Sequence, residues 1–146
     1  MTGLNHVLTG VAIAVSVRHP VLAPVLSLVS HFVLDSLPHF GNHPDFVPYN
    51  RAFKIYLVLE VVFMALITAI GVLLFPDIQW LIILCAGLAF LPDFFWILED
   101  QLKDRNQFMR RFYRFHHGIQ TGEHPRGWII ELAYFGLLLL IVWLYT

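Results

Sequence analysis

Long runs of apolar residues, almost free of charge, constrain this chain more than any other feature. The five runs are Val7–Val17, Val21–Leu37, Ile55–Phe75, Ile78–Leu98 and Trp128–Tyr145. A helix that spans a bilayer needs about 20 residues, within a range of roughly 17–25. The last three runs meet that length, and the first two are expected to form a tight hairpin of helices. Two re-entrant half-helices are the alternative for that pair.

The charge content supports this interpretation. Only 13% of the residues are charged and 58% are apolar or aromatic, whereas an average soluble domain carries roughly 25% charged residues. Soluble globular, disordered and disulfide-stapled classes therefore fit poorly. Cys85 is the only cysteine, so no disulfide framework and no cysteine-based zinc motif is expected. The expected fold is an all-α polytopic membrane bundle, forming one domain over residues 1–146.

The basic residues predict an orientation for this bundle. With five spans, residues 42–54 and 99–127 lie on the same side as the amino terminus, and only Arg18 lies on the other side. The basic residues on the amino-terminal side are Arg51, Lys54, Lys103, Arg105, Arg110, Arg111, Arg114 and Arg126. Because basic loops stay in the cytoplasm, the amino terminus is predicted to be cytoplasmic and the carboxyl terminus outside.

Residues 99–127 form the one sizeable polar segment of the sequence. Between Leu102 and Phe115, arginine and lysine alternate with aromatic residues. This pattern predicts a cytoplasmic amphipathic helix that lies on anionic lipid head groups. Basic residues interleaved with aromatics also occur in nucleic-acid binding, but the position beside the membrane favours lipid as the partner.

The strongest chemical motif lies at the end of the second apolar run. His31 and Asp35 are four residues apart, so both side chains leave one face of a helix. Pro38 cannot continue that helix, which should end near Leu37 and leave His39 on the following turn. Two imidazoles and a carboxylate suit Zn²⁺ or another borderline divalent ion. The alternative is that Asp35 only accepts a hydrogen bond from His31.

Two later motifs offer further ligands. Asp93 follows Pro92, so it either caps a new helix or supplies a second carboxylate ligand. His116 and His117 are adjacent, and neighbours on a helix diverge by about 100°. Both can bind one ion only if the backbone turns there, which Gly118 would allow.

Three further polar residues lie close to the apolar runs or within them. His6 precedes the first run, Glu60 lies inside the third, and Glu131 lies one turn into the last. Neither glutamate has a basic neighbour in sequence, so each is expected to pair with histidine, metal or water. The predicted orientation places nearly all the candidate ligands at the cytoplasmic ends of their segments, where they could form one site.

Together these motifs resemble the YdjM-type membrane-bound metal-dependent hydrolases, small inner-membrane proteins. The resemblance rests on Asn5-His6, the Ser-His-x-x-x-Asp-x-x-Pro-His stretch at 30–39, Leu-Pro-Asp at 91–93 and the late histidines. A more remote similarity links the pattern to zinc-dependent phospholipase C. The resemblance implies an inner-membrane location and a set of metal ligands. These ligands are His6, His31, Asp35, Asp93 and one of His116 or His117.

The chain departs from the family pattern at Phe95, where members commonly carry a second aspartate. This departure is compatible with a mononuclear site, with another ligand such as Glu60, or with lost hydrolysis. The function expected is metal-dependent hydrolysis of a phosphoester or lipid-like substrate, with Glu60 or His39 as the base toward water. The alternatives are a non-catalytic metal-binding or ion-handling protein and a structural membrane protein.

Overall fold

A computed structural model of the chain describes residues 1–41, 50–96, 98–102, 106–120 and 122–146. Most of these residues are helical, which confirms the predicted all-α class. The helices are α1 (Gly3–Val17), α2 (Leu22–Asp35), α3 (Arg51–Leu74), α4 (Gln79–Trp96), α5 (Glu99–Leu102), α6 (Gln107–Ile119) and α7 (Trp128–Trp143). Two short strands, β1 (His39–Phe40) and β2 (Glu123–His124), pair in parallel.

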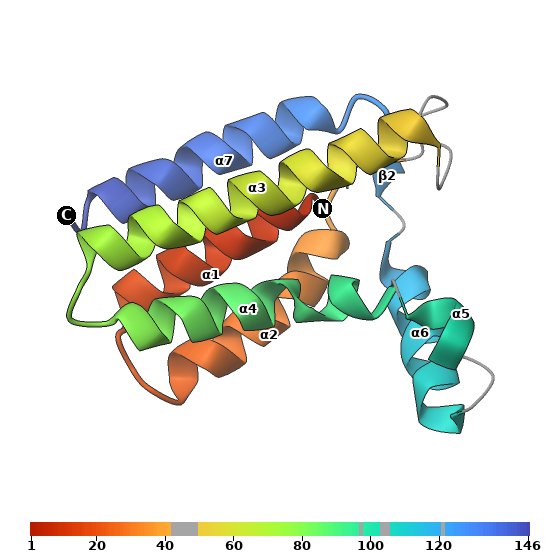
Figure 1. Cartoon of the computed structure of the whole chain (residues 1–146), viewed down its shortest axis with the longest axis horizontal. Coiled ribbons are helices and arrows are strands. Elements are labelled where there is room, and N and C mark those ends of the chain that lie inside the picture. The colour runs from red at the N-terminus through yellow and green to blue at the C-terminus, as the bar shows by residue number, and fades with distance from the viewer. Residues whose placement is uncertain (42–49, 97, 103–105, 121) are drawn as a thin grey trace.

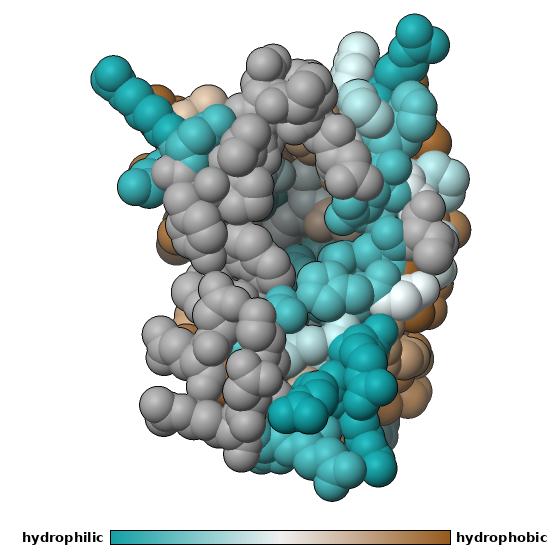
Figure 2. Space-filling model, turned by 90° about the vertical axis from the view of Figure 1, so that its right-hand side faces the viewer, coloured by the Kyte–Doolittle hydropathy of each residue, from teal (hydrophilic) through white to brown (hydrophobic). Residues whose placement is uncertain are grey.

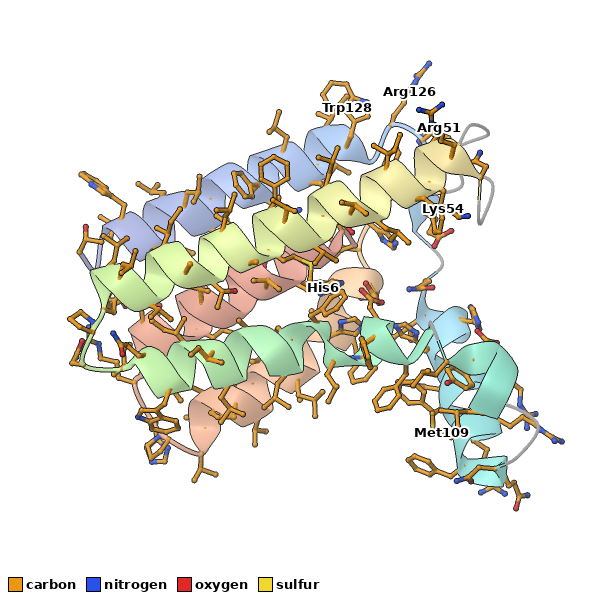
Figure 3. All side chains as sticks on the ribbon, viewed as in Figure 1. His6, Arg51, Lys54, Met109, Arg126 and Trp128 are labelled. Atoms are coloured by element: carbon orange, nitrogen blue, oxygen red, sulfur yellow. The ribbon has the colours of Figure 1, made fainter. Side chains whose placement is uncertain are left out.

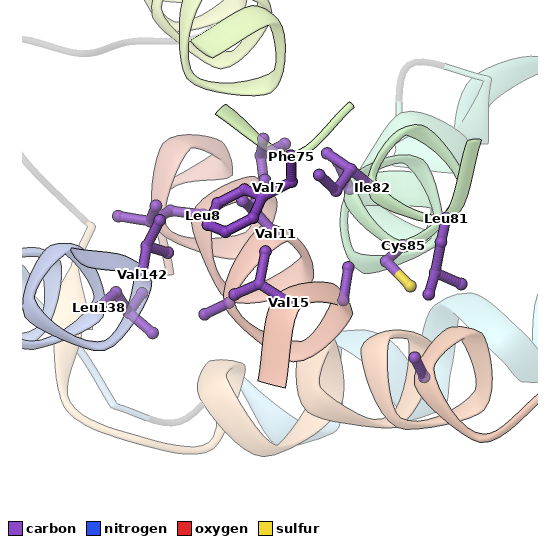
Figure 4. Close-up of a cluster of buried hydrophobic side chains, with 14 residues drawn as sticks. Val7, Leu8, Val11, Val15, Phe75, Leu81, Ile82, Cys85, Leu138 and Val142 are labelled. Carbon is purple, nitrogen blue, oxygen red and sulfur yellow. The ribbon is translucent and has the colours of Figure 1, made fainter. Parts of the chain in front are cut away.

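Helix α1 is the centre of the bundle and packs against α2, α3, α4 and α7 (Figure 1). Its small residues allow this close packing. A Cβ added to Gly10 would lie 2.5 Å from the carbonyl oxygen of Cys85 on α4. The apolar core joins Val11 and Val15 of α1 to Ile82 of α4 and Leu138 of α7 (Figure 4). The amino-terminal helix is therefore enclosed by the others.

Local sequence signals explain where several helices begin and end. Arg18 ends α1 in the left-handed conformation, with φ 49°, and α1 and α2 form the predicted hairpin. Helix α2 ends at Asp35, close to the predicted end, because Pro38 cannot continue it. Asn50 caps α3, since its side chain accepts a hydrogen bond from the Phe53 N–H group.

The helices do not coincide with the apolar runs: α1 and α3 are longer than their runs, whereas α2, α4 and α7 are shorter. Among the described helices, α3 alone is long and apolar enough to cross a membrane by length and composition, with a mean hydropathy of 2.7. Its 24 residues extend for about 36 Å. The other four apolar helices contain 14 to 18 residues and extend for about 21–27 Å, less than the ~30 Å of a hydrocarbon core. The described helices therefore include one that qualifies as a membrane span, and the predicted polytopic bundle stays a prediction.

Charged residues gather at one end of the bundle. Arg51, Lys54 and Arg126 lie at this end, and α6 lies at the same end of the molecule (Figures 1 and 3). The same end is hydrophilic in space-filling view and has a hollow at its centre (Figure 2). Arg18 lies at the opposite end, where it forms a 2.8 Å ion pair with Asp77. Lys103 and Arg105 of the basic segment lie outside the described residues.

The strand pairing fixes the polar end of the molecule. It aligns His39 with Glu123 and Phe40 with His124. A Cβ on Gly127 would overlap the backbone of His39, so glycine is needed where the two segments meet. The pairing holds the chain that follows α6 against the end of α2.

Candidate metal centre

Four side chains from three helices converge on one point. His31 and Asp35 come from α2, Asp93 from α4 and His116 from α6. One nitrogen or oxygen atom of each lies within 4.8 Å of the corresponding atom of every other member. His31 and Asp35 are fully buried, His116 is nearly so, and Asp93 is partly exposed. These four residues are referred to below as the metal cluster.

The distances within the metal cluster suit a single small cation. His31 Nε2 lies 3.0 Å from His116 Nε2, and each nitrogen lies 3.1 Å from Asp35 Oδ2. Asp93 Oδ1 lies 3.7 Å from both nitrogens. Two ligands of a tetrahedral zinc ion, at about 2.0–2.1 Å from the metal, are separated by about 3.3 Å. The observed separations bracket that value, so the residues fit a zinc-sized ion.

The hydrogen bonding of His31 shows which of its nitrogens faces this point. His31 Nδ1 lies 2.8 Å from the carbonyl oxygen of Ala89, which can only accept, so Nδ1 carries the proton. In the neutral ring, Nε2 then carries a lone pair that faces the point shared with Asp35 Oδ2 and His116 Nε2, where a cation would accept it. A histidine that binds a metal commonly donates its other N–H group to a carbonyl in this way.

Pro92 helps to shape the α4 side of the cluster. It lies inside α4, where it has no backbone N–H group to donate to the carbonyl four residues earlier. The carbonyl that accepts from His31 lies three residues earlier, and Asp93 follows directly. Asp93 lies in the last turn of α4 and not at a helix start, so the capping interpretation of this residue is wrong.

Helix α6 selects His116 and turns His117 away. The helix continues through Gly118 to Ile119, so the backbone turn that would bring both histidines together is absent. His117 Nε2 lies 3.0 Å from Glu99 Oε2, and its side chain is half exposed. His116 instead stacks on Phe112, with ring centroids 5.8 Å apart.

Tyr113 anchors α6 to the end of α4. Its hydroxyl group donates a 2.9 Å hydrogen bond to the carbonyl oxygen of Phe95, and Phe95 also contacts Phe112 edge-on. Burial raises the pKa of the Tyr113 phenol above its ordinary value, and the Glu99 carboxylate raises it further. The anchor explains why α6 presents His116 to the cluster.

The second oxygen of Asp35 has its own set of partners. Asp35 Oδ1 lies 3.0 Å from His6 Nε2 and 2.6 Å from the amino nitrogen of Met1. His6 Nε2 also lies 3.8 Å from Asp93 Oδ2. His6 therefore joins the edge of the metal cluster and faces both carboxylates, while its direct ligation of metal stays a prediction. Gln120 Nε2 donates to Asp35 Oδ2 at 3.3 Å.

The remaining candidates lie around the cluster. Glu60 lines a cavity of about 350 Å³ together with Asp93 and His116, and it accepts a 3.4 Å hydrogen bond from the Leu4 N–H group. His39 is buried, but its Nδ1 donates to the Leu37 carbonyl at 2.7 Å, and it is not part of the metal cluster.

Glu131 has a role that differs from the expected one. Its carboxylate accepts hydrogen bonds from the hydroxyl and N–H groups of Thr2, from Asn5 Nδ2 at 3.1 Å and from the Phe40 N–H group at 2.9 Å. None of the partners described for Glu131 is a histidine, and its pairing with metal or water stays a prediction. Glu131 instead ties α7 to the start of α1 and to β1.

Sequence reasoning did not find Gln120 or the Ala89 carbonyl. Gln120 follows α6 with no motif around it, and a backbone carbonyl leaves no signal in sequence. Pro92 in α4 signals a freed carbonyl four residues earlier, at Leu88, and does not identify that of Ala89.

No protein-family model, no curated protein and no solved structure matches the chain.

Proposed function

We propose that the protein is a membrane-embedded metal-dependent hydrolase that acts on a phosphoester or lipid-like substrate. The observation that carries the proposal is the convergence of His31, Asp35, Asp93 and His116 on one point beside a cavity. Two imidazoles and two carboxylates form a set typical of hydrolytic metal sites. The resemblance to the YdjM-type hydrolases agrees with this function.

Zinc is the ion that we propose for the site. Nitrogen and oxygen ligands at tetrahedral spacing favour it over magnesium or calcium, which take more oxygen ligands in larger shells. An ion held by these residues would supply a Lewis acid for a phosphoryl or carbonyl oxygen and would lower the pKa of a bound water.

The chain's own residues supply orientation and proton transfer. The Ala89 carbonyl fixes the His31 ring, and the amide of Gln120 donates to Asp35. Both contacts hold ligand atoms toward the cluster, as supporting hydrogen bonds do in metal sites. Glu60 lines the same cavity as Asp93 and is the base that we assign to accept a proton from water at its carboxylate.

The surface supports placement in a membrane. Large apolar side chains of α2, α3, α4 and α7 are exposed, among them Val29, Val61 and Leu132. Apolar surface on this scale marks an interaction site or contact with lipid. We propose that the basic end faces the cytoplasm, as the distribution of basic residues predicts. We also propose that arginines of α6, Arg111 and Arg114, contact anionic head groups.

Hydrolysis of simple phosphoesters by purified protein in detergent tests this function. We expect activity that is lost on chelation and restored by zinc. Asp35→Asn should lose both metal and activity, because Asp35 contacts both histidines of the cluster. Asp77→Asn is the matched control, since Asp77 pairs with Arg18 at the opposite end. Activity that is unchanged in folded Asp35→Asn would refute the proposal.

A further inference from the structure

Two adjoining hollows lead away from the metal cluster. The first is the cavity of about 350 Å³ already described, and its apolar wall includes Val61, Met64 and Phe90. The second, of about 300 Å³, runs between α3 and α4 and has the same three residues in its wall. The two hollows therefore adjoin each other at these three side chains, with a polar end at Glu60 and Asp93 and an apolar end farther along α3.

Met64 and Phe90 border the junction of the two hollows. A Cβ added to Gly3 would lie 2.8 Å from Met64 Sδ and 3.0 Å from Phe90 Cε2, so both side chains converge on the start of α1. Methionine is flexible and adapts to irregular spaces. A thin, flexible hydrocarbon chain is the shape that passes from one hollow to the other when the Met64 side chain moves aside.

The second hollow is dry in character. Its wall is formed almost entirely by hydrocarbon groups, including Ala65, Ile83 and Gly87. The hydroxyl group in this wall belongs to Thr68, and it already donates a 2.9 Å hydrogen bond to the Met64 carbonyl. Polar ligands would find nothing to bind there, whereas an alkyl chain would lose no hydrogen bond.

The outer side of this hollow belongs to α3. This helix is the one described helix that is able to cross a membrane by length and composition. Only 6% of the residues in its most apolar stretch are buried. In a bilayer, the α3–α4 groove therefore opens toward lipid. Glu60 and Thr68 are eight residues apart on α3, which corresponds to about 12 Å along the helix axis.

We propose that the substrate is an amphiphile whose hydrocarbon chain lies in the α3–α4 groove while its polar ester group lies beside Glu60, Asp93 and His116. The ester hydrolysis in this inference rests on the proposed function. The groove does not, because it is formed by the packing of α3 against α4. The substrate is then a lipid-like ester that enters the site laterally from the membrane.

Gly87 offers a way to fill the groove without disturbing the fold. A Cβ added there meets nothing within 4 Å, and Gly87 lines the groove. Gly136 on α7 has the same open surroundings and does not line the groove. Gly87→Leu and Gly136→Leu are therefore a matched pair.

The experiment uses full-length protein in nanodiscs and a dodecyl phosphate with a photoreactive diazirine at the end of its chain. We expect labelling of residues on α3 and α4 that line the groove, and competition by excess dodecyl phosphate but not by ethyl phosphate. Gly87→Leu should reduce this labelling at least tenfold, while Gly136→Leu leaves it unchanged. Equal labelling of the two variants, or labelling spread evenly over the exposed helices, would overturn the inference.

Hydrolysis of p-nitrophenyl phosphate, which has no alkyl chain, separates this inference from the proposed function. Turnover that is the same in both variants, with labelling lost only in Gly87→Leu, supports both. Turnover without groove labelling refutes the groove alone. Groove labelling in a protein that binds no zinc and hydrolyses nothing refutes the hydrolase and leaves the groove as a lipid-binding site.

Discussion

The contact between α1 and α4 at Gly10 makes a sharp prediction about stability. A Cβ at Gly10 would lie 2.5 Å from the Cys85 carbonyl oxygen and 2.8 Å from the Ala86 Cα. All the near atoms belong to the backbone, so no side chain can rotate away. Optimal carbon contacts are about 3.5–4.0 Å, and Gly10→Ala therefore forces the two helices apart by about 0.7–1 Å.

Gly87→Ala isolates the cost of this separation. Both glycines lie within helices, so both substitutions gain about 1 kcal/mol of helix propensity. Only Gly10→Ala adds the overpacking cost, which is typically about 1–3 kcal/mol. At about 3 °C for each kcal/mol, we expect the melting temperature of Gly10→Ala to be about 3–9 °C below that of Gly87→Ala.

Thermal unfolding in detergent, followed by circular dichroism, measures the difference. Because α1 carries His6 and α4 carries Asp93, Gly10→Ala should also weaken metal binding while Gly87→Ala should not. Equal melting temperatures for the two variants would show that α1 and α4 are not in close contact, and would refute the packing at the centre of the bundle.

Three further predictions concern Glu60, Glu131 and the arginines of α6. Glu60→Gln should lower the turnover of a phosphoester by about 10²–10⁴-fold with zinc content unchanged, and a loss of zinc would instead make Glu60 a ligand. Glu131→Ala should lower the free energy of unfolding by about 1–3 kcal/mol, because it leaves donors on Thr2, Asn5 and β1 without an acceptor. Asp77→Ala at an exposed ion pair should cost less than about 1 kcal/mol, and equal losses in denaturant titrations would argue against the assigned role of Glu131. Arg111→Ala combined with Arg114→Ala should reduce the anionic lipid that is retained in native mass spectrometry, whereas unchanged retention would remove lipid binding from α6.

Much of the candidate site could be predicted from the sequence because two simple rules apply to it. His31 and Asp35 share a helical face through their spacing alone. The distribution of basic residues predicts which ends of the helices face the cytoplasm, and this orientation places His6, Asp93 and the late histidines at one end of the bundle. The structure brings residues from that end together around Asp35.

The choice between His116 and His117 depended on tertiary contacts. It is set by how Tyr113 and Phe112 dock α6 against Phe95, and such a contact between distant segments leaves no periodic signal. The same holds for Glu131, whose partners lie about 90 to 130 positions away in the chain.

The two-residue strands and the lengths of the helices also escaped sequence reasoning. β1 and β2 are too short for an alternating pattern to be recognised. The apolar runs do not mark the ends of the helices, because apolar residues such as Ile78 and Tyr145 lie outside α4 and α7. Hydropathy identifies an apolar segment, but it does not determine at which residue the helix begins or ends.

The central claim is that His31, Asp35, Asp93 and His116 hold one metal ion. Elemental analysis of purified wild-type protein, beside His116→Ala and His117→Ala, tests it most directly. The two variants remove adjacent histidines of one helix, so they are matched in chemistry and differ in whether the ring faces the cluster. We expect about one zinc per chain in the wild type and in His117→Ala, and a loss of zinc in folded His116→Ala. Zinc content that is absent from folded wild type after reconstitution, or equal in the two variants, would contradict the account.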